Sequence, residues 1–247
     1  MTTTKVVPGM LIAVPSAEDV AREAATRLAK TLREAVKARG KATIALSGGD
    51  TPRQTYTRLA EEPDVPWASV EVYFVDERAV PPTDDRSNYR WAKECLLDRA
   101  KIPAAHVHRM RADERDLEAA ARDYEHEIQA GVGVGQGGVP SFDVMVLGVG
   151  DDGHTASLFP GMPTVEITDR IVVAVGKTEG REERLTVTAP IIEQARGVFV
   201  LAVGAKKTNA LERVWAVSGS LRDTPARVIR SARGAIHWII DKAAGGM

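Results

Sequence analysis

The stretch Ala42-Thr43-Ile44-Ala45-Leu46-Ser47-Gly48-Gly49-Asp50-Thr51-Pro52 predicts a buried strand, a glycine turn and the start of a helix in direct succession. The apolar run over 42–46 has the length of a strand rather than of a helix. Thr51 suits the N-cap of the following helix, and Pro52 suits its first turn, where a missing N–H costs nothing. A short apolar strand that passes straight into a helix is typical of α/β proteins.

The helix that precedes this strand carries a signal at each end. Ser16 suits its N-cap, with Asp19 in the first turn, and Gly40 suits its C-terminal cap. Aliphatic residues recur at every fourth position and so share one face of the helix: Val20, Ala24, Leu28, Leu32 and Val36.

Strands and helices continue to alternate along the chain. Apolar runs predict further strands over 6–14, 70–75, 142–147, 171–175, 185–188, 198–203 and 235–240. Further helices are expected from 88 to about 98, over 113–130 and over 206–217. This alternation indicates an α/β fold, an open, mostly parallel sheet with helices on both faces, Rossmann-like in character. Neither a linker nor an internal repeat divides the sequence, so residues 1–247 are expected to form a single domain.

The composition argues against several classes of partner. Lys and Arg number 33 against 34 Asp and Glu, a near-balance that gives no general attraction to nucleic acid or to an anionic membrane. No apolar run has the length of a membrane span, and residues 1–14 lack the features of a secretory signal. Cys95 is the only cysteine, which excludes an intrachain disulfide. We therefore expect a cytoplasmic protein, a monomer or small homo-oligomer, whose partner is a small molecule.

Polar segments directly follow three of the apolar strands. Ligands of open parallel sheets bind beyond the carboxyl ends of the strands, so we expect these segments to meet on one rim. In the first segment, Ser47, Gly48 and Gly49 precede a helix, and adjacent glycines let backbone N–H groups approach an anion at the helix N-terminus. The second, Asp76-Glu77-Arg78, places charges after a buried strand, which is costly unless they face a cleft. Plain solvated turns are the competing interpretation of both segments.

The third segment is Gly148-Val149-Gly150-Asp151-Asp152-Gly153-His154-Thr155-Ala156-Ser157. It matches G-x-G-x-x-G after a strand, so a dinucleotide site is one interpretation. Asp151 and Asp152 would repel a pyrophosphate at this turn, which weighs against it. His154 beside these carboxylates is better interpreted as a proton-transfer group.

Two further cations could complete the rim. Arg184 begins an apolar run, and Lys206 stands at a helix start, where the helix dipole opposes a cation unless it faces an anion. His106 and His108 are spaced to share a face of a strand, but no third ligand is suitably spaced. The sequence therefore predicts no metal site.

In combination and order, these motifs resemble those of the 6-phosphogluconolactonase family. The resemblance extends over nearly the whole chain and includes Arg184-Leu185-Thr186 and Gly204-Ala205-Lys206. The segment Lys177-Thr178-Glu179-Gly180-Arg181-Glu182-Glu183 departs from it, because it lacks the prolines typical of the family at that point. The related glucosamine-6-phosphate deaminases usually have Asp-Glu-Tyr where this chain has Asp76-Glu77-Arg78, and Asn-Glu-Pro-Gly after the histidine. These differences favour the lactonase.

The resemblance implies hydrolysis of 6-phosphoglucono-δ-lactone to 6-phosphogluconate in the oxidative branch of the pentose phosphate pathway, with no metal or organic cofactor. His154 is expected to activate water and Asp152 to orient its imidazole, with Asp76 as the competing base. The expected substrate and phosphate ligands are Ser47, Gly48, Gly49, Arg78, Arg184 and Lys206. Arg78 could instead stabilise the oxyanion. A deaminase or isomerase, a non-catalytic sugar-phosphate sensor and an NAD(P)-binding protein remain as alternatives.

Overall fold

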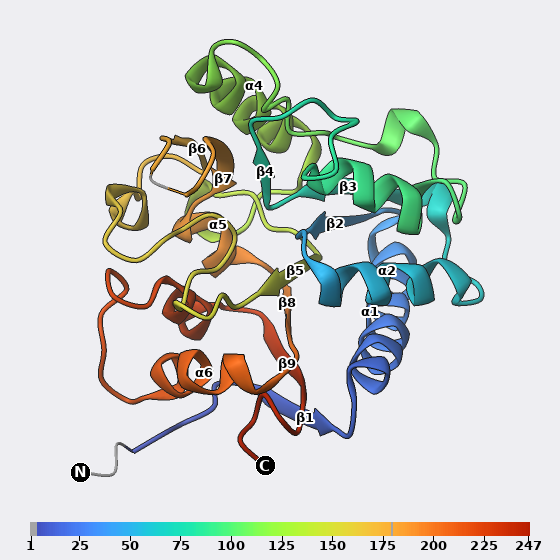
Figure 1. Cartoon of the computed structure of the whole chain (residues 1–247). Coiled ribbons are helices and arrows are strands. Elements are labelled where there is room, and N and C mark those ends of the chain that lie inside the picture. Colours follow the sequence, from blue (N-terminus) through green and yellow to red (C-terminus); the bar gives the residue numbers. More distant parts are fainter. Residues whose placement is uncertain (1–3, 179) are drawn as a thin grey trace.

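A six-stranded sheet runs through the middle of the protein, whose computed structural model describes residues 4–178 and 180–247 (Figure 1). Its strands are β1 (Met10–Val14), β2 (Ala42–Leu46), β3 (Val70–Phe74), β5 (Val144–Gly148), β8 (Gly197–Ala202) and β9 (Ala235–Asp241). They lie in the order β1-β9-β8-β5-β2-β3, and every neighbouring pair is parallel. The predicted mostly parallel sheet is therefore confirmed.

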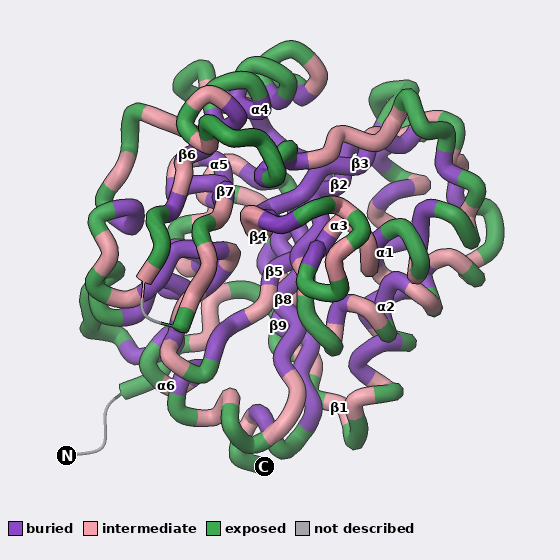
Figure 2. Tube along the Cα trace, turned by 45° about the horizontal axis from the view of Figure 1, so that its top comes forward, coloured by how far each residue is buried: buried purple, intermediate pink, exposed green. Residues whose placement is uncertain are grey.

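Helices cover both faces of this sheet, as the alternation of apolar runs predicted. Figure 1 shows α1 (Ala17–Arg39) and α2 (Asp50–Glu61) on one side, with α5 (Ala189–Gln194) and α6 (Thr208–Trp215) on the other. Except for β1 at the edge, whose residues are exposed or half-buried, the strands are buried along most of their length (Figure 2), and every residue of β2 is buried. A strand covered on both faces must be apolar throughout, which explains the continuous apolar runs of the sequence.

The first helix has the ends that its sequence predicted. The Ser16 side chain accepts a hydrogen bond from the Asp19 N–H at the start of α1. At the other end, Gly40 adopts a left-handed conformation with φ of 77°, and its N–H donates to the Val36 carbonyl. Within the described residues, no helix is both long and apolar enough to cross a membrane.

A second, three-stranded sheet differs from the prediction. It consists of β4 (Asp76–Arg78), β7 (Arg184–Val187) and β6 (Val172–Val175), in that order, with both pairs antiparallel. The sequence predicted β6 and β7 as strands but Asp76–Arg78 as a loop. Residues 176–183 are too few to form the crossover that parallel strands require, so β6 and β7 pair antiparallel. The N–H of Val75 bonds to β2 and its carbonyl to β7, so this residue links the two sheets.

Three expected helix starts also differ. The helix expected over 113–130 begins at Leu117, where the Asp116 side chain accepts from the Ala119 N–H as its N-cap. Helix α2 begins at Asp50, and Gly49 rather than Thr51 is its N-cap, without a side-chain hydrogen bond. The helix expected over 206–217 divides into a 3-10 turn at Ala205–Lys207 and α6. The remaining helices are α3 (Asn88–Ala92), which continues into a π-helical turn at Lys93–Leu97, and α4 (Leu117–Gly131).

The carboxyl ends of β8, β5, β2 and β3 stand side by side on one rim of the larger sheet. From β2 the chain continues to β3 on one side, whereas from β5 it continues to β8 and β9 on the other. The crevice between β2 and β5 is therefore the switch point at which open parallel sheets bind ligands.

Candidate active site

The segments that follow β2, β3, β5 and β8 line one pocket of about 230 Å³ at this switch point. The structure thus brings together residues from segments that are far apart in the sequence, as the rim argument predicted. Of the predicted site residues, the following line the pocket: Ser47, Gly48, Gly49, Asp76, Arg78, His154 and Arg184.

The glycine turn presents the N-terminus of α2 to the pocket. Gly49 has φ of 107°, a conformation that residues with a side chain rarely adopt. A Cβ on Gly48 would lie only 1.9 Å from Oδ1 of Asn88, so this position has no room for a side chain. The first N–H groups of a helix lack partners within the helix, and together with the helix dipole they favour an anion.

The Asp76 carboxylate is buried and surrounded by donors. The Ser157 hydroxyl donates to Oδ2 at 2.6 Å, and Asn88 Nδ2 donates to Oδ1 at 3.1 Å. Arg184 Nη1 lies 3.5 Å from Oδ2. Because both carboxylate oxygens already accept hydrogen bonds, the Asp76 side chain is held in one orientation, tied to Ser157, Asn88 and Arg184.

The charged residues of β4 point alternately to opposite sides, as side chains on a strand do. Asp76 and Arg78 line the pocket, and Arg78 Nη1 donates to Asn88 Oδ1 at 2.9 Å. Glu77 is turned away from the pocket and buried. Its carboxylate accepts from the N–H groups of Arg78, Asn88 and Tyr89, each at 2.8 Å. Burial raises the pKa of Glu77 against the lowering effect of these bonds. Glu77 thereby fixes β4 to the start of α3.

His154 and Asp152 form a close pair beside the pocket. The imidazole Nδ1 lies 2.6 Å from Asp152 Oδ1, and the His154 backbone N–H donates to the same oxygen at 3.1 Å. Burial tends to raise the pKa of Asp152, but hydrogen bonds from His154 and the charge of Arg181 hold it well below its usual range. The ionised carboxylate therefore accepts a hydrogen bond from a protonated Nδ1. Nε2 is then the imidazole nitrogen available for chemistry.

The two further predicted cations, Arg184 and Lys206, have different environments. The Arg184 side chain is mostly buried at the pocket wall, and burial lowers its pKa while the neighbouring Asp76 opposes that shift. Lys206 is exposed and does not line the pocket, whereas its neighbour Lys207 does. Lys207 Nζ also pairs with Asp151 Oδ1 at 2.7 Å, which holds it at the rim.

Sequence reasoning missed Asn88 and Ser157 as members of this site. The pattern Ser87-Asn88 before an expected helix is typical of a helix cap, and the Ser87 side chain does accept from the Arg90 N–H. The Asn88 side chain turns the other way, toward Asp76 and Arg78. Nothing in the local pattern separates these two uses of a polar residue at a helix start.

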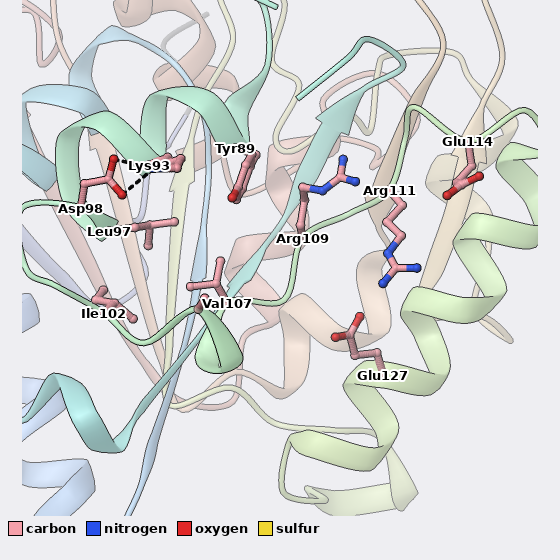
Figure 3. Close-up of a pocket in the computed structure, with 11 residues that line it drawn as sticks. Tyr89, Lys93, Leu97, Asp98, Ile102, Val107, Arg109, Arg111, Glu114 and Glu127 are labelled. Carbon is pink, nitrogen blue, oxygen red and sulfur yellow. Dashed lines mark hydrogen bonds and ion pairs between the residues drawn. The ribbon is translucent and has the colours of Figure 1, made fainter. Parts of the chain in front are cut away.

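A second, larger pocket of about 540 Å³ lies between the turn at Lys93–Leu97 and α4 (Figure 3). None of the predicted site residues lines it, and its described lining includes neither a histidine nor a glycine turn. Several of its charges are already matched: Lys93 pairs with Asp98 at 2.6 Å, and Arg109 pairs with Asp113 at 2.6 Å. Its chemistry is that of a solvated groove. Residues 4–178 and 180–247 also contain no group of three or more His, Cys, Asp or Glu side chains placed to hold a metal ion.

Comparisons with known proteins agree with this geometry. Residues 15–238 match the family model described as glucosamine-6-phosphate isomerases/6-phosphogluconolactonase. The 6-phosphogluconolactonase of a Synechocystis species is 41% identical over 220 residues, which cover 89% of this chain and 88% of that protein. The 6-phosphogluconolactonase of a Nostoc species is 38% identical, with 85% and 86% covered. The solved structure of 6-phosphogluconolactonase from Trypanosoma brucei is 26% identical, covers 99% of both chains and superposes with a TM-score of 0.87.

Proposed function

This chain belongs to the glucosamine-6-phosphate isomerase/6-phosphogluconolactonase family, and from that premise we propose that it hydrolyses 6-phosphoglucono-δ-lactone to 6-phosphogluconate in the oxidative branch of the pentose phosphate pathway. One observation carries the proposal. A glycine turn suited to a phosphate lines the same small pocket as His154, whose imidazole pairs with the Asp152 carboxylate and is thereby suited to proton transfer. A sugar lactone that bears a phosphate at its far end needs both.

His154 acts as the general base. Its Nε2 takes a proton from the attacking water, and the imidazolium then returns a proton to the ring oxygen as the lactone C–O bond breaks. Asp152 holds the ring through Nδ1 and stabilises its charged form, since its carboxylate is ionised over the working pH range. The lactone carbonyl is already electrophilic, so the protein's remaining task is to position the water and to stabilise the oxyanion.

Asp76 has a positioning role in this mechanism, and Arg78 binds the substrate. Three donors surround Asp76, which supports a positioning role: it holds Arg184 and, through Asn88, the guanidinium of Arg78. Arg78 lines the pocket and either stabilises the oxyanion or binds the phosphate. This assignment leaves His154 as the proton acceptor rather than Asp76.

The substrate phosphate binds over the turn of Ser47, Gly48 and Gly49, with Arg184 as its charged partner. Lys207 is the lysine best placed to contribute, because it lines the pocket, whereas Lys206 would have to turn toward it. Hydrolysis is favoured over deamination because segment 154–160 contributes only His154 and Ala156 to the lining, and no carboxylate.

The test is acid release from the lactone at constant pH, corrected for spontaneous hydrolysis. His154→Asn should lower turnover by about 10²- to 10⁴-fold, the usual contribution of a general base, with an unchanged circular dichroism spectrum. His126→Asn is the matched control, since His126 is exposed on α4. Near-normal turnover in His154→Asn would reject the role. Ammonia release from glucosamine 6-phosphate would favour a deaminase. Tight binding of a sugar phosphate without turnover would favour a sensor, and binding of NADPH would favour a dinucleotide site.

We also propose that the enzyme works in the cytoplasm on this small molecule, without nucleic acid, as a monomer or small homo-oligomer. A phosphorylated sugar is charged and stays in the compartment where it is made. The balanced charge of the chain offers no basic surface for nucleic acid. Cell fractionation and light scattering check these statements.

A further inference from the structure

Arg181 lies against the carboxylate of the His154–Asp152 pair. It belongs to the segment that connects β6 to β7, and its Nη2 donates to Asp152 Oδ2 at 2.8 Å. The other oxygen of that carboxylate, Oδ1, serves His154. One carboxylate is thus shared between an imidazole and a guanidinium, one on each oxygen.

The Phe159 ring contacts both the Arg181 guanidinium and the His154 ring. The Arg181 guanidinium carbon lies 4.2 Å from the centre of the Phe159 ring, and the His154 ring centre lies 4.9 Å from it. The guanidinium is therefore fixed by a hydrogen-bonded charge and by an aromatic face at once. Such a position is more definite than that of an ordinary surface arginine, whose ion pairs contribute little.

We infer that Arg181 is a positioning residue for the proposed hydrolysis: it fixes Asp152 and, by sharing that carboxylate, sets the pH at which His154 becomes an effective base. The inference rests on the proposed function for its kinetic consequence. Neither the sequence motifs nor the resemblance assigned a role to Arg181.

Several other charged groups lie near the His154–Asp152 pair. Arg181 touches Asp152 directly, and Arg184 lies 5.5 Å from the same Phe159 ring. Asp76 also lines the pocket and is tied to Arg184. Asp151 is matched by Lys207, and its carbonyl accepts from Arg213. Arg181 is therefore the cation whose removal changes what Asp152 can offer to His154.

Two effects follow when Arg181 loses its charge. Asp152 then balances the imidazolium alone, which favours the protonated ring and moves the acid limb of the kcat/KM profile to higher pH. The shift should be on the order of half a pH unit, as expected for partly exposed charges a few ångströms apart in a high effective dielectric. Asp152 also loses one of its anchors, so the imidazole is held less well and kcat falls about 3- to 10-fold with little change in KM.

The chain offers a matched control in the next residue. Glu182 pairs with Arg86 at 2.7 Å and anchors the same connecting segment, without contacting Asp152. Glu182→Gln loosens the segment and leaves the shared carboxylate in place. Arg181→Lys keeps a charge near Asp152 but not the flat guanidinium.

The experiment compares the pH profiles of kcat/KM for the wild type, Arg181→Met, Arg181→Lys and Glu182→Gln. Arg181→Met should move the acid limb upward, Arg181→Lys should restore most of its position, and Glu182→Gln should give no upward shift. In an Asp152→Asn background, Arg181→Met should add no further shift. Coincident limbs in wild type and Arg181→Met, or an equal shift in Glu182→Gln, would overturn the inference.

A measurement without turnover separates this inference from the proposed function. In Arg181→Met, the pH midpoint of the His154 imidazole titration, followed by NMR, should move to higher pH, as the acid limb of kcat/KM does. This shift is expected even if the lactone is not the substrate. An unchanged titration in a folded Arg181→Met protein rejects the inference, whereas absent lactone hydrolysis in the wild type rejects the function alone. If Arg181→Met does not fold, Arg181→Gln, which also removes the charge but keeps a polar side chain, replaces it in the titration, with Glu182→Gln as the control.

Discussion

At the scale of single residues, the site depends on positions that have no room for a side chain. Gly150 is an example, because a Cβ there would lie 2.0 Å from Nδ1 of His154 and 2.7 Å from Oδ1 of Asp152. Gly150 does not have a positive φ, so its backbone conformation is open to alanine, and the nearest atoms that a Cβ would meet belong to His154 and Asp152.

Gly150→Ala should therefore displace His154 and lower kcat about 10²-fold, toward the loss expected for removal of the base. The unfolding transition should change little, since the conflict involves partly exposed side chains. Steady-state kinetics together with thermal unfolding measure both. Gly176→Ala is the control, because a Cβ there meets nothing within 4 Å and its φ is not positive. Wild-type kcat in Gly150→Ala would show that the pair has more freedom than the structure describes.

The residue scale is also where sequence reasoning reaches its limit. Runs of apolar residues placed His154, Asp76 and the glycine turn after strands, and parallel strands bring such ends to one rim. To decide whether Lys206 or Lys207 faces the pocket, one must also know where the turn that contains them begins. Both lie in a 3-10 turn, in which each residue rotates the side chain by about a third of a turn, so the exact start of the turn decides which lysine faces the pocket. A sequence pattern does not determine that start.

At the scale of elements, His108 ties β3 to α4. Its Nε2 lies 2.8 Å from Glu71 of β3, and its Nδ1 lies 2.7 Å from Glu127 of α4. The ring also stacks on Tyr73 at 4.2 Å. Burial lowers the pKa of His108, but the two carboxylates outweigh that effect and the net shift is upward. The charged imidazole is thus part of the contact between these two elements.

Protein stability should depend on pH through this contact. A histidine whose pKa is raised on folding contributes stability that is complete below its unfolded value, about 6.5, and is lost as pH rises through the folded value. The free energy of unfolding should therefore fall as pH rises above about 6.5, by less than about 1 kcal/mol because the pair with Glu127 is partly exposed. Urea titrations at several pH values measure the slope. His108→Gln should make the free energy of unfolding less dependent on pH. The same pH dependence in His108→Gln and the wild type would contradict the role assigned to His108.

The apolar pattern of the sequence predicts some strands of the fold and not others. The parallel strands are apolar runs because both faces are covered, so their pattern is visible in the sequence. Strand β4 is three charged residues, Asp76, Glu77 and Arg78, and owes its existence to pairing with β7. Its partner lies more than a hundred residues away, and no local propensity favours a strand there.

At the scale of the whole molecule, the net charge of −1 gives no long-range attraction for an anionic substrate. Binding must then come from the pocket, where we propose that Arg184 and the N-terminus of α2 bind the phosphate. A ligand that binds only the folded state stabilises it by RT ln(1 + [L]/Kd), about 2.7 kcal/mol at a hundredfold excess over Kd. For a chain of this size, that corresponds to a rise in Tm of roughly 5–10 °C.

6-Phosphogluconate should give this rise, and gluconate, which lacks the phosphate, should give almost none. Arg184→Ala should abolish most of the rise and raise KM more than it lowers kcat, because a phosphate contact is equal in ground and transition states. The comparison uses the ligand-induced change in Tm of each variant, since removal of a buried arginine beside Asp76 also lowers the starting Tm. Lys206→Ala and Lys207→Ala, measured in the same way, decide which lysine reaches the phosphate. An equal rise with gluconate would mean that recognition depends on the sugar hydroxyls, and the phosphate would then have to be placed elsewhere than over the glycine turn.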